Sequence, residues 1–388
     1  MIKWYYAVII LISDGDKMKA QLKELFNEYG FDENKYIGMR GISVGHINTT
    51  YTLYFDFGAR VKRYLLQEIN VNVFKKPDEL MENIDRVTSY AYSLLKGFDV
   101  PNRNNKVLRI VKTVSGKTYI KTSDNRYFRI YHFTEGGISY NRSTDPQIFE
   151  SAGHVIGFFQ NMLANYPIET LHETIPNFHN TPKRFERFVK VLNSASDEIK
   201  NTCKEEINFY LDNKDIAYSI EPLLESHEMP LRVTHNDTKI NNVMFDATTN
   251  EGLCLVDLDT VMPGSTCYDF GDFVRSGCNM GEEDSKDLSE VVFNKELFLS
   301  FAKGYVGSLS GSIKEIELKN LTQGALLITY ECGMRFLTDY LEGNIYFKVQ
   351  YKEHNLVRSR TQIEMIKQIR SCKDELDREI MNIYNEVK

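Results

Sequence analysis

The sequence has few cysteines, and those it has follow no motif. The six are Cys203, Cys254, Cys267, Cys278, Cys332 and Cys372, with no C-x-x-C pair and no regular spacing. Such a set indicates neither a disulfide framework nor a cysteine metal site. We therefore expect reduced thiols in a cytoplasmic protein. No two histidines have ligand spacing on one predicted element, so a histidine metal site is not expected.

A membrane-length hydrophobic run and a block of basic residues are also missing. Residues 4–12 form an apolar run too short to span a membrane, and residues 13–16 make a poor signal-peptide cleavage site. We expect residues 1–17 to be a dispensable extension or to follow a misplaced start codon, with a weak secretory signal as the alternative. The formal net charge is −7, so neither a nucleic-acid nor a membrane partner is expected. A monomer is expected, because no predicted helix has an obvious unpaired face.

The hydrophobic pattern changes partway along the chain, which predicts two domains. Alternating, β-branched stretches predict strands at residues 36–43, 49–57, 63–69, 107–114, 117–121 and 127–133, and Pro77 opens a helix at 77–95. From about residue 145 the apolar spacing becomes helical, and further helices are predicted at 178–213, 322–341 and near the C-terminus. We predict an α+β protein with an antiparallel β-rich lobe at 18–134 and a mainly helical lobe at 135–388.

The strongest catalytic pattern lies within the helical part. Asp237 follows a histidine and an asparagine, Asn242 comes five residues later, and Asp257 ends the second strand of a predicted hairpin. Phosphoryl transfer from ATP needs one Asp to accept the proton of the acceptor hydroxyl, and an Asn with a second Asp to hold Mg²⁺. If Asp237 and Asn242 merely capped a turn, nothing would call for Asp257. Asp259 would either assist a second Mg²⁺ or serve the structure.

Six segments resemble the N-acetylhexosamine 1-kinases, within the aminoglycoside phosphotransferase/choline kinase family. They are residues 40–48, 235–242, 257–264, 268–272, 335–343 and 354–362, of which the last two are distinctive of the sugar-kinase subgroup. The resemblance implies a two-lobed protein-kinase-like fold, with an antiparallel β-sheet N-lobe that binds the nucleotide and a helical C-lobe that binds the substrate. It also implies phosphorylation of the anomeric 1-hydroxyl of N-acetylglucosamine or N-acetylgalactosamine, with ATP and Mg²⁺.

The resemblance also implies the nucleotide contacts. Ser43, Val44 and Gly45 would lie over the phosphates with their backbone N–H groups, although an ordinary hairpin turn is the alternative. His46 at the tip of this turn would reach either phosphate or sugar. Backbone groups of Phe133, Thr134 and Glu135 would bind adenine.

The third predicted strand departs from protein kinases. Gln67 stands where they have a lysine that contacts the α and β phosphates. Glutamine carries no charge, so Glu82 on the next helix has no lysine to pair with. Lys239, two residues after Asp237, is placed as the lysine that neutralises the transferring phosphoryl group in protein kinases; the alternative is a solvated loop lysine. We predict that Lys239 supplies much of the missing charge.

Arg335 and Tyr346 match the positions that bind the hexosamine in the resembling family. An arginine fork can bind ring hydroxyls or the acetamido carbonyl, and a tyrosine ring can pack on the apolar face of a sugar. The alternatives are a helix-surface arginine and a core tyrosine. We expect Asp339 to join Arg358 and Arg360 in an ion-pair network.

Two further residues belong to the resemblance. Asp269 is predicted to buttress the catalytic loop by accepting backbone hydrogen bonds. His179 also belongs to the resemblance, and the sequence suggests no physical role for it.

Two other functions stay open. A related kinase would act on choline, an aminoglycoside, a simple hexose or another alcohol or amine. A cationic amine calls for acidic clusters or aromatic cages, which the segment around Arg335 does not favour. A non-catalytic binder would normally have lost Asp237, Asn242 or Asp257, and all three are present.

Overall fold

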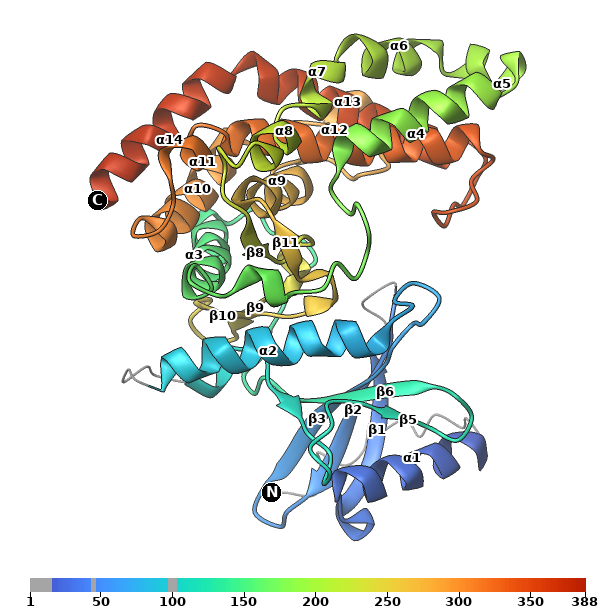
Figure 1. The fold of residues 1–388 in the computed structure, drawn as a ribbon, viewed down its shortest axis with the longest axis vertical. Coiled ribbons are helices and arrows are strands. Elements are labelled where there is room, and N and C mark those ends of the chain that lie inside the picture. The colour runs from blue at the N-terminus through green and yellow to red at the C-terminus, as the bar shows by residue number, and fades with distance from the viewer. Residues whose placement is uncertain (1–15, 43–46, 97–102) are drawn as a thin grey trace. The chain divides into compact units, whose positions relative to one another are not determined.

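The computed structural model describes residues 16–42, 47–96 and 103–388. The chain divides into two compact units, one ending at Glu135 and the other beginning at Gly136. The first unit is built on an antiparallel sheet and the second mainly on helices (Figure 1). The predicted α+β class is confirmed.

The first unit contains a sheet of six strands in the order β1-β2-β3-β6-β4, with β5 also pairing with β6. Among the described residues of this unit, two α-helices accompany the sheet. The bounds are β1 (Tyr36–Ile42), β2 (Thr49–Asp56), β3 (Val61–Glu68), β4 (Ile110–Val111), β5 (Ile120–Lys121), β6 (Tyr127–His132), α1 (Asp16–Tyr29) and α2 (Pro77–Leu95).

Helix α1 covers one face of this sheet (Figure 1). Its Leu25 and Phe26 pack with Leu53, Leu66 and other apolar strand residues into one buried core. Alternation along β2 and β3 supplies these residues, because every second side chain points to the same face. The expected extension, residues 1–17, lies outside the described residues except where α1 begins.

Strands β4 and β5 are much shorter than the predicted strands at 107–114 and 117–121. Between them the chain turns: Lys117 N donates to Thr113 Oγ1 at 2.9 Å, and Gly116 has φ +84°. The β-branched residues of this stretch raised its strand propensity, but the turn takes the backbone out of the sheet.

The second unit holds twelve helices within the described residues, together with two small sheets. The helices are α3 (Pro146–Met162), α4 (Thr181–Ser194), α5 (Asp197–Thr202), α6 (Lys204–Asp212), α7 (Lys214–Ala217), α8 (Glu221–Glu225), α9 (Thr266–Gly277), α10 (Lys295–Leu309), α11 (Glu315–Leu318), α12 (Leu321–Leu341), α13 (His354–Ser371) and α14 (Lys373–Val387).

Helix α12 is the centre of this unit and is buried along most of its length. It packs against α4, α9 and α13 (Figure 1). Helices α9 and α12 approach closely at Gly271 and Gly324, where a Cβ on Gly271 would meet the Gly324 carbonyl oxygen at 2.3 Å. The close crossing matters for the site, because α9 carries Asp269.

The two small sheets flank the segment that carries the predicted catalytic residues. β8 (Arg232–Thr234) pairs with β11 (Met262–Gly264), and β9 (Val243–Asp246) lies between β10 (Gly252–Leu255) and β7 (Gly137–Ile138). The hairpin predicted around residues 242–257 is therefore present.

Two predicted helices are interrupted. The stretch 178–213 forms α4, α5 and α6, because Ala195 is extended and Ser196 caps α5 by accepting from Ile199 N. The C-terminal stretch breaks at Cys372 into α13 and α14.

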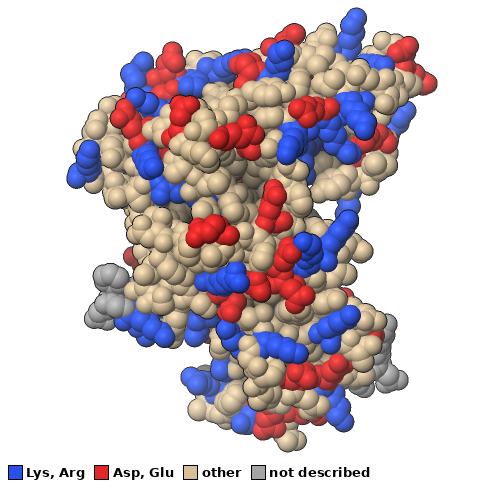
Figure 2. All heavy atoms as spheres, viewed as in Figure 1, with Lys and Arg blue, Asp and Glu red and all other residues tan. Residues whose placement is uncertain are grey.

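Charged side chains of both signs are interspersed over the face of each unit drawn in Figure 2. No helix within the described ranges is long and apolar enough to cross a bilayer.

Candidate active site

The predicted catalytic segment is a short loop between β8 and β9. Residues 235–239 leave β8, and a single 3₁₀ turn, Ile240–Asn242, leads into β9. Asn236 has φ +64°, a left-handed conformation that asparagine adopts more readily than most residues. The side-chain Nδ2 of Asn236 donates to Thr260 O at 2.9 Å, and its Oδ1 accepts from Thr234 Oγ1 at 2.9 Å. These bonds hold the backbone immediately before Asp237.

Asp269 on α9 accepts hydrogen bonds from the backbone of the same loop. Its Oδ2 accepts from His235 N at 2.9 Å and its Oδ1 accepts from Asn236 N at 2.7 Å. Gln160 on α3 donates a third bond, at 2.6 Å, to Oδ2. Burial raises the pKa of this carboxyl, while the nearby His235 and these donors favour its ionised form. The predicted buttress is confirmed.

His179 contacts the same loop, which the sequence did not predict. Its Nε2 lies 3.1 Å from Asn236 O and its Nδ1 lies 3.0 Å from Glu331 Oε1 on α12. Carbonyl and carboxylate oxygens are both acceptors, so either ring nitrogen forms a hydrogen bond here when it carries the proton. Burial raises the pKa of Glu331, but Arg184, His179 and Arg335 bring it down to about 2. His179 thus ties the loop to an ionised carboxylate on the central helix.

The three residues of the catalytic pattern lie together in the second unit. Asn242 Nδ2 donates to Asp237 O at 2.8 Å and to Asp237 Oδ2 at 3.1 Å. Val256 N donates to Asn242 O at 2.9 Å, which brings the backbone before Asp257 against Asn242. Asp257 itself has φ +60° and ends the hairpin. Asn242 thus lies against the predicted proton acceptor, and the residue before Asp257 is bonded to Asn242.

The donor set fits Mg²⁺. Because the Asn242 nitrogen is committed to Asp237, its oxygen is the atom left for a cation, and Asp257 adds a carboxylate. Mg²⁺ in phosphoryl transfer takes only one or two protein ligands, with phosphates and waters completing the shell. Among the residues that the structure describes, no cluster of three or more His, Cys, Asp or Glu side chains is arranged to hold a metal ion.

Asp259 lies beyond the hairpin strand and not on its continuation. The left-handed turn at Asp257 ends the extended run, and Leu258–Thr260 forms a 3₁₀ turn. The side chain of Asp259 is buried.

Lys239 is an ion-pair partner of the predicted proton acceptor. Its Nζ lies 3.0 Å from Asp237 Oδ1. Burial lowers the pKa of Lys239, but the Asp237 and Asp272 carboxylates raise it above its ordinary value. The lysine is therefore held as a cation beside Asp237.

Replacing Lys239 by alanine is expected to lower kcat at least about tenfold, because a charge that neutralises the transferring phosphoryl group is lost. Steady-state kinetics measure this, with Lys303→Ala as the control, since Lys303 pairs with Glu150 on the surface. A loss of less than about threefold would contradict the role of Lys239.

The predicted nucleotide residues lie in the first unit. Gln67 on β3 donates to Thr50 Oγ1 at 3.0 Å and accepts from Arg129. Ser43, Val44, Gly45 and His46 lie outside the described residues.

At the end of the first unit, two residues of the predicted adenine-binding segment contact other side chains of that unit. Arg63 lies over the Phe133 ring, 4.0 Å from its centroid, and forms a forked ion pair with Glu135. Asn105 Nδ2 donates to Glu135 O at 3.0 Å. Thr134 lies between them and is half-buried.

The predicted sugar-binding pair lies where α12 ends and the next loop begins. The Arg335 guanidinium is 5.8 Å from the Tyr346 ring centroid and 5.5 Å from that of Phe347. Tyr346 is 72% exposed, which rules out the alternative of a core tyrosine. Asp339 shapes the loop by accepting from Tyr346 N at 2.8 Å and Phe347 N at 3.0 Å.

The expected ion-pair network around Asp339 is wrong. Asp339 accepts from backbone N–H groups and from Asn355 Nδ2 at 2.8 Å. Arg360 instead pairs with Glu206, and Arg358 donates to Lys348 O at 3.3 Å. Backbone partners explain the error, since they leave no mark on the sequence.

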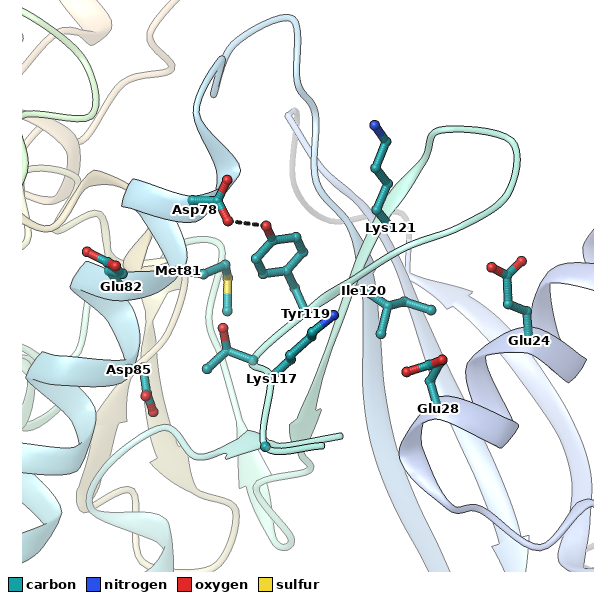
Figure 3. A pocket seen from close by; sticks show the side chains of 12 residues that line it. Glu24, Glu28, Asp78, Met81, Glu82, Asp85, Lys117, Tyr119, Ile120 and Lys121 are labelled. Atoms are coloured by element: carbon teal, nitrogen blue, oxygen red, sulfur yellow. Dashed lines mark hydrogen bonds between the residues drawn. The ribbon is translucent and has the colours of Figure 1, made fainter. Parts of the chain in front are cut away.

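A cavity of about 520 Å³ in the first unit is lined by residues of α1, α2 and the β5 region. Figure 3 shows Tyr119 hydrogen-bonded to Asp78 there, with Met81 beside them on α2. The lining includes none of the predicted site residues.

The chain is similar to known phosphotransferases in sequence pattern and in fold. The model of the phosphotransferase enzyme family matches residues 40–287. A spectinomycin phosphotransferase solved with ADP and spectinomycin is 15% identical with a TM-score of 0.56, over 91% of this chain and 98% of that one. An ethanolamine kinase of Plasmodium vivax is 14% identical with a TM-score of 0.57, over 94% of this chain and 93% of that one. A choline kinase of Cryptosporidium parvum is 15% identical with a TM-score of 0.53, over 95% of this chain and 99% of that one. These likenesses confirm the kinase-like fold.

Proposed function

Since the chain belongs to the phosphotransferase enzyme family, we propose that it transfers the γ-phosphoryl group of ATP to the anomeric 1-hydroxyl of an N-acetylhexosamine. The observation that carries the phosphoryl-transfer part is the joining of Asp237, Lys239 and Asn242 on one buttressed loop. The sugar acceptor rests on Arg335, Tyr346 and the segments that resemble the N-acetylhexosamine 1-kinases.

The loop residues have separable tasks in this proposal. Asp237 binds the sugar hydroxyl, aligns it with the γ-phosphate and accepts its proton late in the step. Lys239 neutralises charge on the phosphoryl group. Asn242 and Asp257 would hold Mg²⁺, which neutralises the phosphates when bound. The bonds from Asp269 and His179 to the backbone at 235 and 236 keep Asp237 in place.

The acceptor side is supported by the shape of the loop after α12. Tyr346 exposes an aromatic face and Arg335 offers a donor fork next to it. The fork suits the acetamido carbonyl or a ring hydroxyl, and the ring suits the apolar face of a hexose.

A cationic acceptor such as choline or ethanolamine is the second candidate. It draws on the similar solved structures, which include a choline kinase and an ethanolamine kinase. Aromatic rings bind quaternary amines by cation–π contact. Here Arg335 already lies over both Tyr346 and Phe347, and its charge repels a second cation, so the sugar is favoured.

A coupled assay of ADP release tests both candidates on one preparation. The panel holds N-acetylglucosamine, N-acetylgalactosamine, galactose, choline, ethanolamine and an aminoglycoside. Methyl glycosides of the two acetylated sugars are the matched controls, because their 1-oxygen carries no hydrogen to replace. We expect turnover with at least one free N-acetylhexosamine and none with its methyl glycoside. Equal turnover of the glycoside would contradict the anomeric hydroxyl, and turnover confined to amines would support the second candidate.

A further inference from the structure

Three polar side chains form a row across the sheet of the first unit. Thr50 on β2 pairs with Gln67 on β3, and Gln67 pairs with Arg129 on β6. Their chain neighbours Leu66 and Phe128 belong to the core under α1. Since successive side chains of a strand point to opposite faces, the polar row lies on the face away from that core.

Arg129 carries its charge into the interior of this unit, because its side chain is fully buried. Its Nε and Nη2 atoms donate to Gln67 Oε1 at 3.1 and 3.0 Å. Its Nη1 lies 3.7 Å from Sδ of Met81 on α2, and the guanidinium lies 5.3 Å from the centroid of the Tyr131 ring. An arginine side chain has donors only, so the oxygen of the Gln67 amide must face it. The buried guanidinium therefore fixes which way the amide points.

The fixed orientation turns the Gln67 nitrogen away from Arg129. Nε2 donates to Thr50 Oγ1 at 3.0 Å, which uses one of the two N–H groups of the amide. Charge-assisted bonds to the carbonyl oxygen polarise the amide and strengthen its N–H groups as donors. A neutral glutamine backed by a buried cation can thus present a strong donor at the strand position where protein kinases have a lysine.

We propose that Arg129 is a positioning residue for nucleotide binding and acts through Gln67. The inference rests on the proposed function, because it assumes that nucleotide phosphates bind to the Gln67 amide nitrogen. Arg129 sets the direction of that amide and supplies the positive charge that is missing at position 67 of strand β3, without touching the nucleotide itself.

A double-mutant cycle on the affinity for MgADP, measured by calorimetry, tests the proposal. We expect Arg129→Met and Gln67→Met each to weaken binding about tenfold, and the double variant to be weakened about tenfold rather than a hundredfold, because the two residues act as one unit. Arg126→Met is the matched control. Arg126 lies just before β6 and pairs with Glu68, so binding should stay within about twofold of wild type. Additive losses in the double variant would overturn the proposal.

Rescue distinguishes positioning from general support of the fold. Gln67→Lys puts a second cation beside Arg129 and should weaken binding, whereas Gln67→Lys combined with Arg129→Met should restore it to within about threefold of wild type. Failure of this rescue would overturn the proposal. If Arg129→Met does not fold, as judged by its thermal unfolding, Arg129→Lys replaces it in the cycle, since lysine keeps the charge but not the fork.

The readout also separates this inference from the proposed function. MgADP binding needs no sugar, so a wrong acceptor leaves the cycle intact. Wild-type affinity in Arg129→Met would sink the inference alone. A wild-type chain that does not bind MgADP would sink the inference and the proposed function together.

Discussion

Replacing Asp237 by asparagine is expected to lower kcat by about a thousandfold, because the acceptor hydroxyl then has no group to take its proton. Asparagine has nearly the same shape. It keeps an oxygen that can accept from Asn242 Nδ2, which lies 3.1 Å from Asp237 Oδ2. The affinity for MgADP should stay within about threefold, since the change removes a transition-state interaction rather than a binding contact. Steady-state turnover and calorimetric MgADP binding measure the two effects separately.

The matched control for this variant is Asp246→Asn, which makes the same chemical change at the end of β9. Asp246 accepts from Thr248 N at 2.9 Å and Thr249 N at 3.0 Å in the hairpin turn, and an asparagine oxygen accepts both bonds equally well. Its kcat should match that of the wild type. Turnover of Asp237→Asn within tenfold of wild type would remove Asp237 from the role of proton acceptor. An equal loss in MgADP affinity and turnover would make it a binding residue.

The elements that sequence reasoning located best are those with a local signal. Alternation marked β1, β2, β3 and β6, and Pro77 marked the first residue of α2. The role of Asp269 was also predicted, although its backbone partners are 33 and 34 residues away, because it belongs to a segment of the family resemblance. The strands and the start of α2 share a feature, which is that the sequence signal lies within a few residues of the element it predicts.

Contacts between distant residues could not be predicted in this way. His179 and Glu331 are 152 residues apart, and Gln67 and Arg129 are 62 apart. Nothing in either segment alone tells which polar side chain will meet it. The partners of Asp339 could not be predicted either. They are backbone N–H groups, and every residue but proline carries one.

Replacing Asp269 by asparagine should damage both stability and turnover. The two carboxylate oxygens accept three N–H groups, from His235, Asn236 and Gln160. An asparagine has one oxygen, so its NH₂ group must face at least one of these donors whichever way it turns. Asp269 is fully buried, and a buried donor left without an acceptor costs about 1–3 kcal/mol. We expect the free energy of unfolding, measured in urea, to fall by about that amount.

The same change should lower kcat by about a hundredfold, because a displacement of about 1 Å at the reacting group is enough for such a loss. Asn236 N donates to Asp269 Oδ1 at 2.7 Å. Because Asn236 directly precedes Asp237, weakening this bond should displace the proposed proton acceptor. Asp145→Ala is the control. Asp145 caps α3 by accepting from Gln147 N, and its loss should cost about 1 kcal/mol of stability with unchanged kcat. If Asp269→Asn lost stability like Asp145→Ala but kept wild-type turnover, the buttress would support the fold without positioning Asp237.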